Sequence, residues 1–207
     1  MKDNYEIIKD LSGAEPSAKD GFSADNTNAA VNFSQAETGN NPSVNLVTGR
    51  LRYVFGDVSI GYGNFAIQVN HVYTSTRNSN FKNKFSEFGN NWKLNLSQCV
   101  VNGGADFLYM DGQGDVHRFV KFDGDRYYDE CNANLVLSVE SSAINKIRYD
   151  YVITDNVGNK MYFGENGLII AAQDGHNASM VKCFVYNANN LLTEVYDART
   201  EKKCIRF

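Results

Sequence analysis

The sequence has little proline and few cysteines, and both facts bear on the structures that it can form. The two prolines, Pro16 and Pro42, both precede residue 43, so proline interrupts none of the later strand patterns. The four cysteines are widely spaced and form no Cys-x-x-Cys pair, which removes the main signature of zinc and thioredoxin-like sites. We therefore expect free thiols, no metal and no cofactor.

Long apolar runs and an excess of positive charge are also missing. The apolar runs are a few residues long, whereas roughly 20 are needed to span a bilayer. The segment Met1–Glu6 is charged and has no apolar core, so we expect no Sec signal peptide. Residues 1–43 carry three lysines against seven acidic residues, which accounts for the whole net charge of −4. The neutral remainder argues against a nucleic-acid partner, since phosphate neutralisation needs clustered Lys and Arg.

Aromatic residues, by contrast, make up 13% of the chain, and this usage favours sheet. Residues 65–74 and 92–100 alternate apolar and polar side chains, as half-buried strands do. Asn-Gly or Asp-Gly pairs separate such runs, at residues 102–103, 111–112, 123–124, 166–167 and 174–175. At Asn102-Gly103 this signal predicts a type I′ turn, which needs φ > 0 at both central positions. The fold class we predict is all-β, an antiparallel β-hairpin meander.

The composition changes near residue 44. Asn, Ser, Ala, Asp and Thr dominate residues 1–43, where no period of 2 or 3.6 persists. A segment with so little apolar surface cannot offset the entropy of ordering. We predict a disordered or weakly helical tail over residues 1–43 and one β-sheet domain over residues 44–207.

A repeat of 23 residues occurs near the C-terminus. Phe163-Gly164-Glu165-Asn166-Gly167-Leu168-Ile169 aligns with Tyr186-Asn187-Ala188-Asn189-Asn190-Leu191-Leu192. Met161, Phe184 and Phe207 share the same offset. Self-similarity of this kind indicates stacked supersecondary units, each unable to bury its apolar face alone. The chain ends inside a third copy, so we expect a fragment whose last strand presents an open edge.

The segment Phe184–Val195 is similar to the YD repeat of bacterial RHS proteins, aromatic-x-Tyr-Asp-x-x-Gly-x-Leu. Asn187 replaces the usual Asp, and Asn190 replaces the usual Gly, a mild departure because Asn tolerates left-handed backbone. Four upstream segments resemble further elements of the same proteins in the same order, at residues 44–51, 69–75, 88–92 and 111–119. The resemblance covers residues 44–207.

The resemblance implies a spiral β-sheet shell that encloses a C-terminal toxin or presents a surface for cell contact. It implies a secreted or cell-surface location for the full-length protein. The partners it implies are further RHS repeats, or a C-terminal toxin cargo, in the same or a neighbouring chain. We therefore predict a structural shell or interaction module that is not an enzyme. The alternatives are an adhesive or carbohydrate-binding sheet that contacts cell-surface glycan, and a β-rich hydrolase.

The residues we expect to matter are structural, and none is predicted to be catalytic. One group should pack in the core: Phe65, Ile67, Val69, Trp92, Tyr151, Phe163, Leu168, Tyr186 and Leu191. A second group should set turns: Asn102, Gly103, Asn166, Gly167, Asn189 and Asn190.

Few residues are candidates for chemistry. We interpret His71 as a hydrogen-bonded structural residue, His117 as facing solvent or the opposite sheet surface, and His176 as a loop residue. A nucleophilic pair of Cys183 with His176 stays open, although no motif surrounds Cys183.

Two further segments have simple structural interpretations. The acidic stretch 123–130 places Tyr127 and Tyr128 where a calcium loop needs a ligand and a glycine, so a hairpin turn is favoured. Trp92 opens an alternating run and is predicted to be a core residue, not a sugar platform.

Overall fold

The computed structural model describes residues 33–35, 42–45, 49–62, 65–75, 79–81, 89, 91–131, 134–200 and 202–207. These residues form an almost entirely antiparallel β structure, which confirms the predicted fold class. The helical element there is one short 3₁₀ turn, η2 (Ser79–Phe81). Within this part of the chain we find no helix that could span a lipid bilayer. The predicted tail over residues 1–43 lies mostly outside the described residues, and the first strand begins at Phe33, ahead of residue 44.

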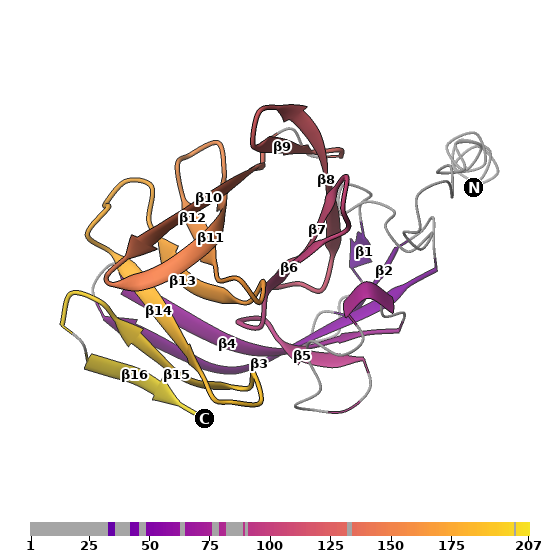
Figure 1. The fold of residues 1–207 in the computed structure, drawn as a ribbon. Helices are drawn as coiled ribbons and strands as arrows, with labels where there is room; N and C mark the ends of the chain where they lie inside the picture. Colours follow the sequence, from indigo (N-terminus) through magenta and orange to yellow (C-terminus); the bar gives the residue numbers. More distant parts are fainter. Residues whose placement is uncertain are drawn as a thin grey trace.

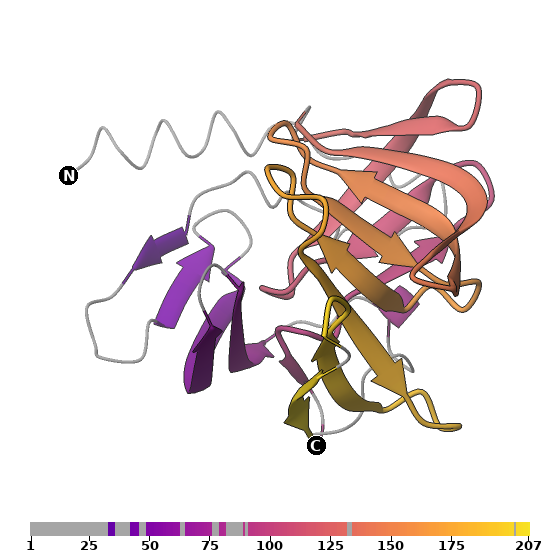
Figure 2. The same cartoon turned by 90° about the vertical axis from the view of Figure 1, so that its left-hand side faces the viewer.

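The strands form two sheets (Figure 1). The N-terminal sheet has five strands in chain order: β1 (Phe33–Gln35), β2 (Pro42–Asn45), β3 (Leu51–Tyr62), β4 (Phe65–Thr74) and β5 (Trp92–Leu94). Figure 2 shows this sheet lying beside the curved C-terminal sheet.

The C-terminal sheet has eleven strands, and each pairs with its neighbours in sequence. They are β6 (Cys99–Asn102), β7 (Phe107–Met110), β8 (Val116–Asp123), β9 (Arg126–Asp129), β10 (Val136–Ile144), β11 (Ile147–Thr154), β12 (Lys160–Phe163), β13 (Ile169–Gln173), β14 (Val181–Tyr186), β15 (Leu192–Asp197) and β16 (Lys202–Arg206). This order is the meander that the alternating runs predict, because two-strand units with tight turns place each strand beside the next.

One main core is built mostly from the C-terminal sheet, with Ile67, Val69 and Leu94 added from the N-terminal sheet, and most of its residues are aromatic or branched aliphatic. Of the predicted packing residues, Ile67, Val69 and Phe163 are buried in this core. Tyr151 and Tyr186 are partly buried against it. The inner face of the C-terminal sheet is therefore filled by the protein's own side chains, as in any close-packed interior.

The remaining predicted packing residues divide between core and periphery. Leu168 is buried in a second cluster with Phe81 of η2, and Trp92 is half-buried. Leu191 is only half-buried, and its neighbour Leu192 takes the core position. The side chain of Phe65 lies outside the described residues.

The C-terminal sheet curves until β6 meets the turn between β12 and β13. The backbone N–H of Val100 donates to the carbonyl oxygen of Gly167 (2.8 Å), and the N–H of Ile169 donates to that of Gln98 (3.1 Å). A Cβ added to Gly167 would overlap the carbonyl oxygen of Val100, and the φ of Gly167 is +77°. Both the approach and the left-handed backbone therefore require glycine at this position.

Four turns of this sheet share one backbone geometry. They begin at Asp111, Asp155, Gly164 and Asn187, and the N–H of the fourth residue donates to the carbonyl of the first in each. The N–H of the first residue donates to the carbonyl of the fifth. The fourth residues have positive φ, namely Gly114, Gly158, Gly167 and Asn190. The last two turns are the predicted 23-residue repeat, so the repeat is a repeated turn geometry.

Hydrogen bonds of its side chain explain why the first residue of this turn is Asp or Asn in three of the four cases. Oδ1 of Asn187 accepts the N–H groups of Asn189 and Leu191 at 2.9 and 3.1 Å. Asp111 and Asp155 make the same pair of bonds to the third and fifth residues of their turns. Side chains of this type stabilise turns by satisfying backbone donors locally. At Gly164 the cap is supplied instead by Asn166, whose Oδ1 accepts the N–H of Leu168.

The predicted type I′ turn at Asn102-Gly103 is wrong. The hairpin exists, but the positive φ lies at Gly104 (+96°), and the Asn102 Oδ1 accepts the N–H of Gly104 at 2.7 Å. The two-residue turn with both φ values positive is Asn145-Lys146, between β10 and β11. This turn contains no glycine, so a search for X-Gly pairs cannot find it.

Candidate functional site at the junction of the two sheets

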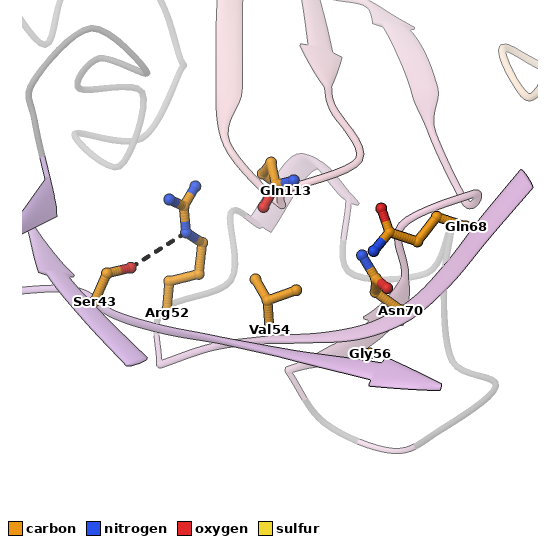
Figure 3. Close-up of a pocket in the computed structure, with 7 residues that line it drawn as sticks. All are labelled: Ser43, Arg52, Val54, Gly56, Gln68, Asn70 and Gln113. Atoms are coloured by element: carbon orange, nitrogen blue, oxygen red, sulfur yellow. Dashed lines mark hydrogen bonds between the residues drawn. The ribbon is translucent and has the colours of Figure 1, made fainter. Parts of the chain in front are cut away.

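A polar pocket lies where the β7–β8 turn reaches the N-terminal sheet (Figure 3). Its volume is about 310 Å³, and its walls come from both sheets. The lining residues are Ser43, Arg52, Val54, Gly56, Gln68, Asn70 and Gln113. Those on β3 lie two apart, because alternate residues of a strand share one face. The side chain of Gln113, from the turn, closes the pocket opposite this face.

Two arginines join the turn to the N-terminal sheet beside the pocket. Asp115 accepts a hydrogen bond from Arg50, and its Oδ2 lies 2.8 Å from Nη1 of Arg52. Nε of Arg52 also donates to Oγ of Ser43, at 3.4 Å. Burial raises the pKa of the Asp115 carboxyl, and the charge of Asp111 adds to this, while both arginines oppose it. The two guanidinium groups therefore hold a buried carboxylate at the contact between the sheets.

His117 continues this charged network inside the C-terminal sheet. Its Nδ1 lies 2.7 Å from Oδ2 of Asp129, and its Nε2 lies 3.5 Å from Oδ2 of Asp111. The ring stacks on Tyr109 with centroids 5.5 Å apart. Burial alone would lower the pKa of His117, but hydrogen bonds and charges of Asp111 and Asp129 outweigh it and raise the pKa to about 10. His117 is therefore a cation at neutral pH.

Asp111, the first residue of the β7–β8 turn, belongs to the same network. Burial would raise the pKa of Asp111, but the hydrogen bond and charge of His117 and the charge of Lys93 lower it. Nζ of Lys93 also donates to the backbone carbonyl of Asp111, which fixes the turn against β5. The expectation that His117 faces solvent is wrong, because its side chain is buried; it does lie on the sheet face opposite Val116, and both faces of β8 are covered there.

Ion pairs and hydrogen bonds of this network connect the two sheets. It combines cationic Arg50, Arg52, Lys93 and His117 with three carboxylates, so its charges nearly balance. Across the part of the chain that the structure describes, no group of three or more His, Cys, Asp or Glu side chains is arranged to hold a metal ion. The chemistry that this geometry supports is hydrogen bonding and charge pairing.

The residues singled out for nucleophilic chemistry lie elsewhere. Cys183 is buried in β14, and burial raises the pKa of its thiol, although hydrogen bonds with Tyr196 and Asn145 oppose this. His176 lies in an exposed turn, where its N–H donates to Oδ1 of Asp174. A raised thiol pKa leaves less of the nucleophilic thiolate at neutral pH.

Two other features, His71 and the turn at residues 123–126, have the structural roles that the sequence predicts. His71 is hydrogen-bonded, with its Nδ1 2.5 Å from Oδ2 of Asp57. Residues 123–126 form a tight hairpin turn with a positive φ at Gly124, as the Asp-Gly signal predicts.

Replacing Asp115 with asparagine should destabilise the protein by about 2–3 kcal/mol, because two half-buried guanidinium groups lose their anionic acceptor. Urea unfolding followed by circular dichroism measures this loss. Asp123→Asn is the matched control, since Asp123 and Arg126 form an exposed ion pair at 3.9 Å and its loss should barely change stability. Equal effects of the two substitutions would contradict a structural role for the junction.

A family model described as a domain of unknown function, DUF6531, matches residues 41–119. The match extends from β2 into β8, so it includes both sides of the junction pocket. No curated protein matches the chain.

Proposed function

We propose that the chain is a non-catalytic structural and interaction module of an RHS/YD-repeat protein. The observation that carries this proposal is the recurrent turn, whose first and fourth residues correspond to the Asp and Gly of the YD pattern. In this proposal each repeat adds one hairpin to a growing sheet. The full-length protein would be secreted or displayed at the cell surface.

Contacts between successive repeats support edge-to-edge stacking. Nδ2 of Asn166 donates to Oδ1 of Asn190 at 3.3 Å, which joins the two repeat turns directly. The strands that flank these turns pair in unbroken antiparallel order from β12 to β15. A hairpin has too little apolar area to be stable alone, so stacking gives each unit its missing partner.

The outermost strand among the described residues is β16, which pairs with β15 on one side. The exposed apolar side chain of Phe207 directly follows this edge strand. We propose that further repeats, in the same or a neighbouring chain, pair with β16. Because this segment fills its inner face with its own side chains, space for a toxin cargo would come from those additional repeats.

The edge pairing can be tested with a synthetic peptide of residues 180–198, which contains one complete strand–turn–strand unit, β14 and β15 with the turn between them. Added in excess, the peptide should slow hydrogen exchange of the β16 amides by adding a strand to the open edge. A control peptide with Asn187→Ala and Asn190→Ala loses both turn determinants and should protect β16 far less. Unchanged β16 exchange with the first peptide would refute the proposal.

A carbohydrate-binding module is the second candidate function. The observation that favours it is an aromatic hollow on the N-terminal sheet, on the face opposite the junction pocket.

A further inference from the structure

The aromatic hollow is formed by three strands of the N-terminal sheet. Its described lining residues are Phe55 and Asp57 of β3, His71 of β4 and Trp92 of β5. In each strand these positions alternate with residues that face the β7–β8 turn, so the hollow and the junction pocket occupy opposite faces. Its volume is about 360 Å³.

The hollow combines aromatic surface with a hydrogen-bonding pair. Phe55 is 44% exposed, and the half-buried indole of Trp92 packs against Tyr73 with ring centroids 5.2 Å apart. The edge of His71 meets Trp92 at 6.5 Å, and its Nδ1 lies 2.5 Å from the carboxylate of Asp57. Single exposed aromatics are common on protein surfaces, but a concave group of them with convergent polar atoms is typical of a ligand site.

We propose that this hollow binds a short neutral saccharide. A pyranose ring has an apolar C–H face, which can stack on the rings of Trp92 and Phe55. It also has hydroxyl groups, which can donate hydrogen bonds to the carboxylate of Asp57. The volume of about 360 Å³ lies near the lower end of the range for small-ligand pockets, which is room for a short saccharide.

The charge of the hollow distinguishes this ligand from others. The Asp57 carboxylate disfavours phosphate and other anions. A quaternary ammonium group also binds aromatic surfaces through cation–π attraction, and it prefers an unpaired carboxylate beside them. Here Asp57 is paired with His71, which reduces the attraction for a cation and leaves a neutral hydroxylated ligand as the best match.

The experiment uses the intrinsic fluorescence of the full chain, because Trp92 is its single tryptophan. Titration with cellotetraose, chitotetraose and mannotetraose should give a saturable change in emission with at least one of them. Phe55→Ala should weaken that binding at least about tenfold, since an aromatic anchor is lost from an exposed position without disturbing the core. Asp57→Ala should also weaken it, by removing the hydroxyl acceptor.

Phe122→Ala is the matched control, because Phe122 is an exposed phenylalanine of β8 that contacts Tyr128 and does not line the hollow. The saccharide affinity of the Phe122→Ala variant should equal that of the unmodified chain. The proposal is overturned by flat titrations with all three saccharides, by saturation with choline alone, or by equal effects of Phe55→Ala and Phe122→Ala. The β16 exchange experiment is independent of Trp92, so the stacking proposal and this one can fail separately.

Discussion

Replacing Gly167 with alanine should destabilise the protein by about 3–5 kcal/mol, one of the largest effects expected of any single substitution. Left-handed backbone costs a non-glycine residue about 1–2 kcal/mol, and Gly167 has a φ of +77°. The new Cβ would overlap the carbonyl oxygen of Val100, so β6 and the β12–β13 turn must separate. That separation weakens two backbone hydrogen bonds, each contributing about 1 kcal/mol, and disturbs the packing of Leu168.

Gly104→Ala is the control for this substitution. Gly104 also has a positive φ, +96°, but a Cβ added there would have no atom within 4 Å. Its cost should therefore be the backbone term alone, about 1–2 kcal/mol. Urea unfolding measures both variants, and similar losses would show that the contact of Gly167 with Val100 contributes little to stability.

The second large effect concerns pH and His117. The folded-state pKa of this residue, about 10, lies above its ordinary value of 6.5. A raised pKa means that its stabilising contribution is complete below pH 6.5 and is lost as the pH rises through 10. Since one pKa unit corresponds to about 1.4 kcal/mol, we expect a loss of several kcal/mol across this window. Unfolding free energies measured at pH 6, 8 and 10 by urea titration provide the test.

His117→Gln should remove most of this pH dependence and should lower stability at neutral pH, because Asp129 and Asp111 lose their cationic partner. His176→Gln is the control, since His176 lies in an exposed turn. If both variants kept the pH dependence of the unmodified protein, the buried imidazolium could not be its source.

Local signals were sufficient to predict the type of fold. Alternation over residues 65–74 and the Asn or Asp that opens three of the four recurrent turns act over a few residues, so they are visible in the sequence. The pairing of strands in chain order follows from those short turns. The glycine-free turn at Asn145-Lys146 was missed because Lys gives no turn signal, although the backbone there has φ > 0 at both positions.

The prediction for Leu191 failed because of register. The pairing shifts between Val185 and Tyr186, so Tyr186 lies opposite Leu192 and that side chain takes the buried position. A shift by one residue exchanges the two faces of a strand, and sequence alternation alone does not reveal it.

The junction site could not be predicted, because its contacts join distant parts of the chain. Arg50 and Arg52 reach Asp115 across 65 and 63 residues, and no local pattern links them. Both faces of β8 are covered at Val116 and His117, so the rule that one face meets solvent did not apply there. The aromatic hollow was missed because Trp92 opens an alternating run that indicates a core strand. The next apolar residue of that run, Leu94, is buried, whereas Trp92 is half-buried.

Strand β6 meets a turn instead of a whole strand edge, and under the stacking proposal this would set the direction in which further repeats extend the sheet. Among the described residues, the backbone hydrogen bonds between β6 and this turn join residues 98–100 to residues 167–169, and β13 goes on to pair with β14. Strands β14 to β16 then lie displaced to one side of the closed circuit in both views (Figures 1 and 2). If further repeats add hairpins as proposed, each new hairpin would continue from this displaced edge and the sheet would extend as a spiral.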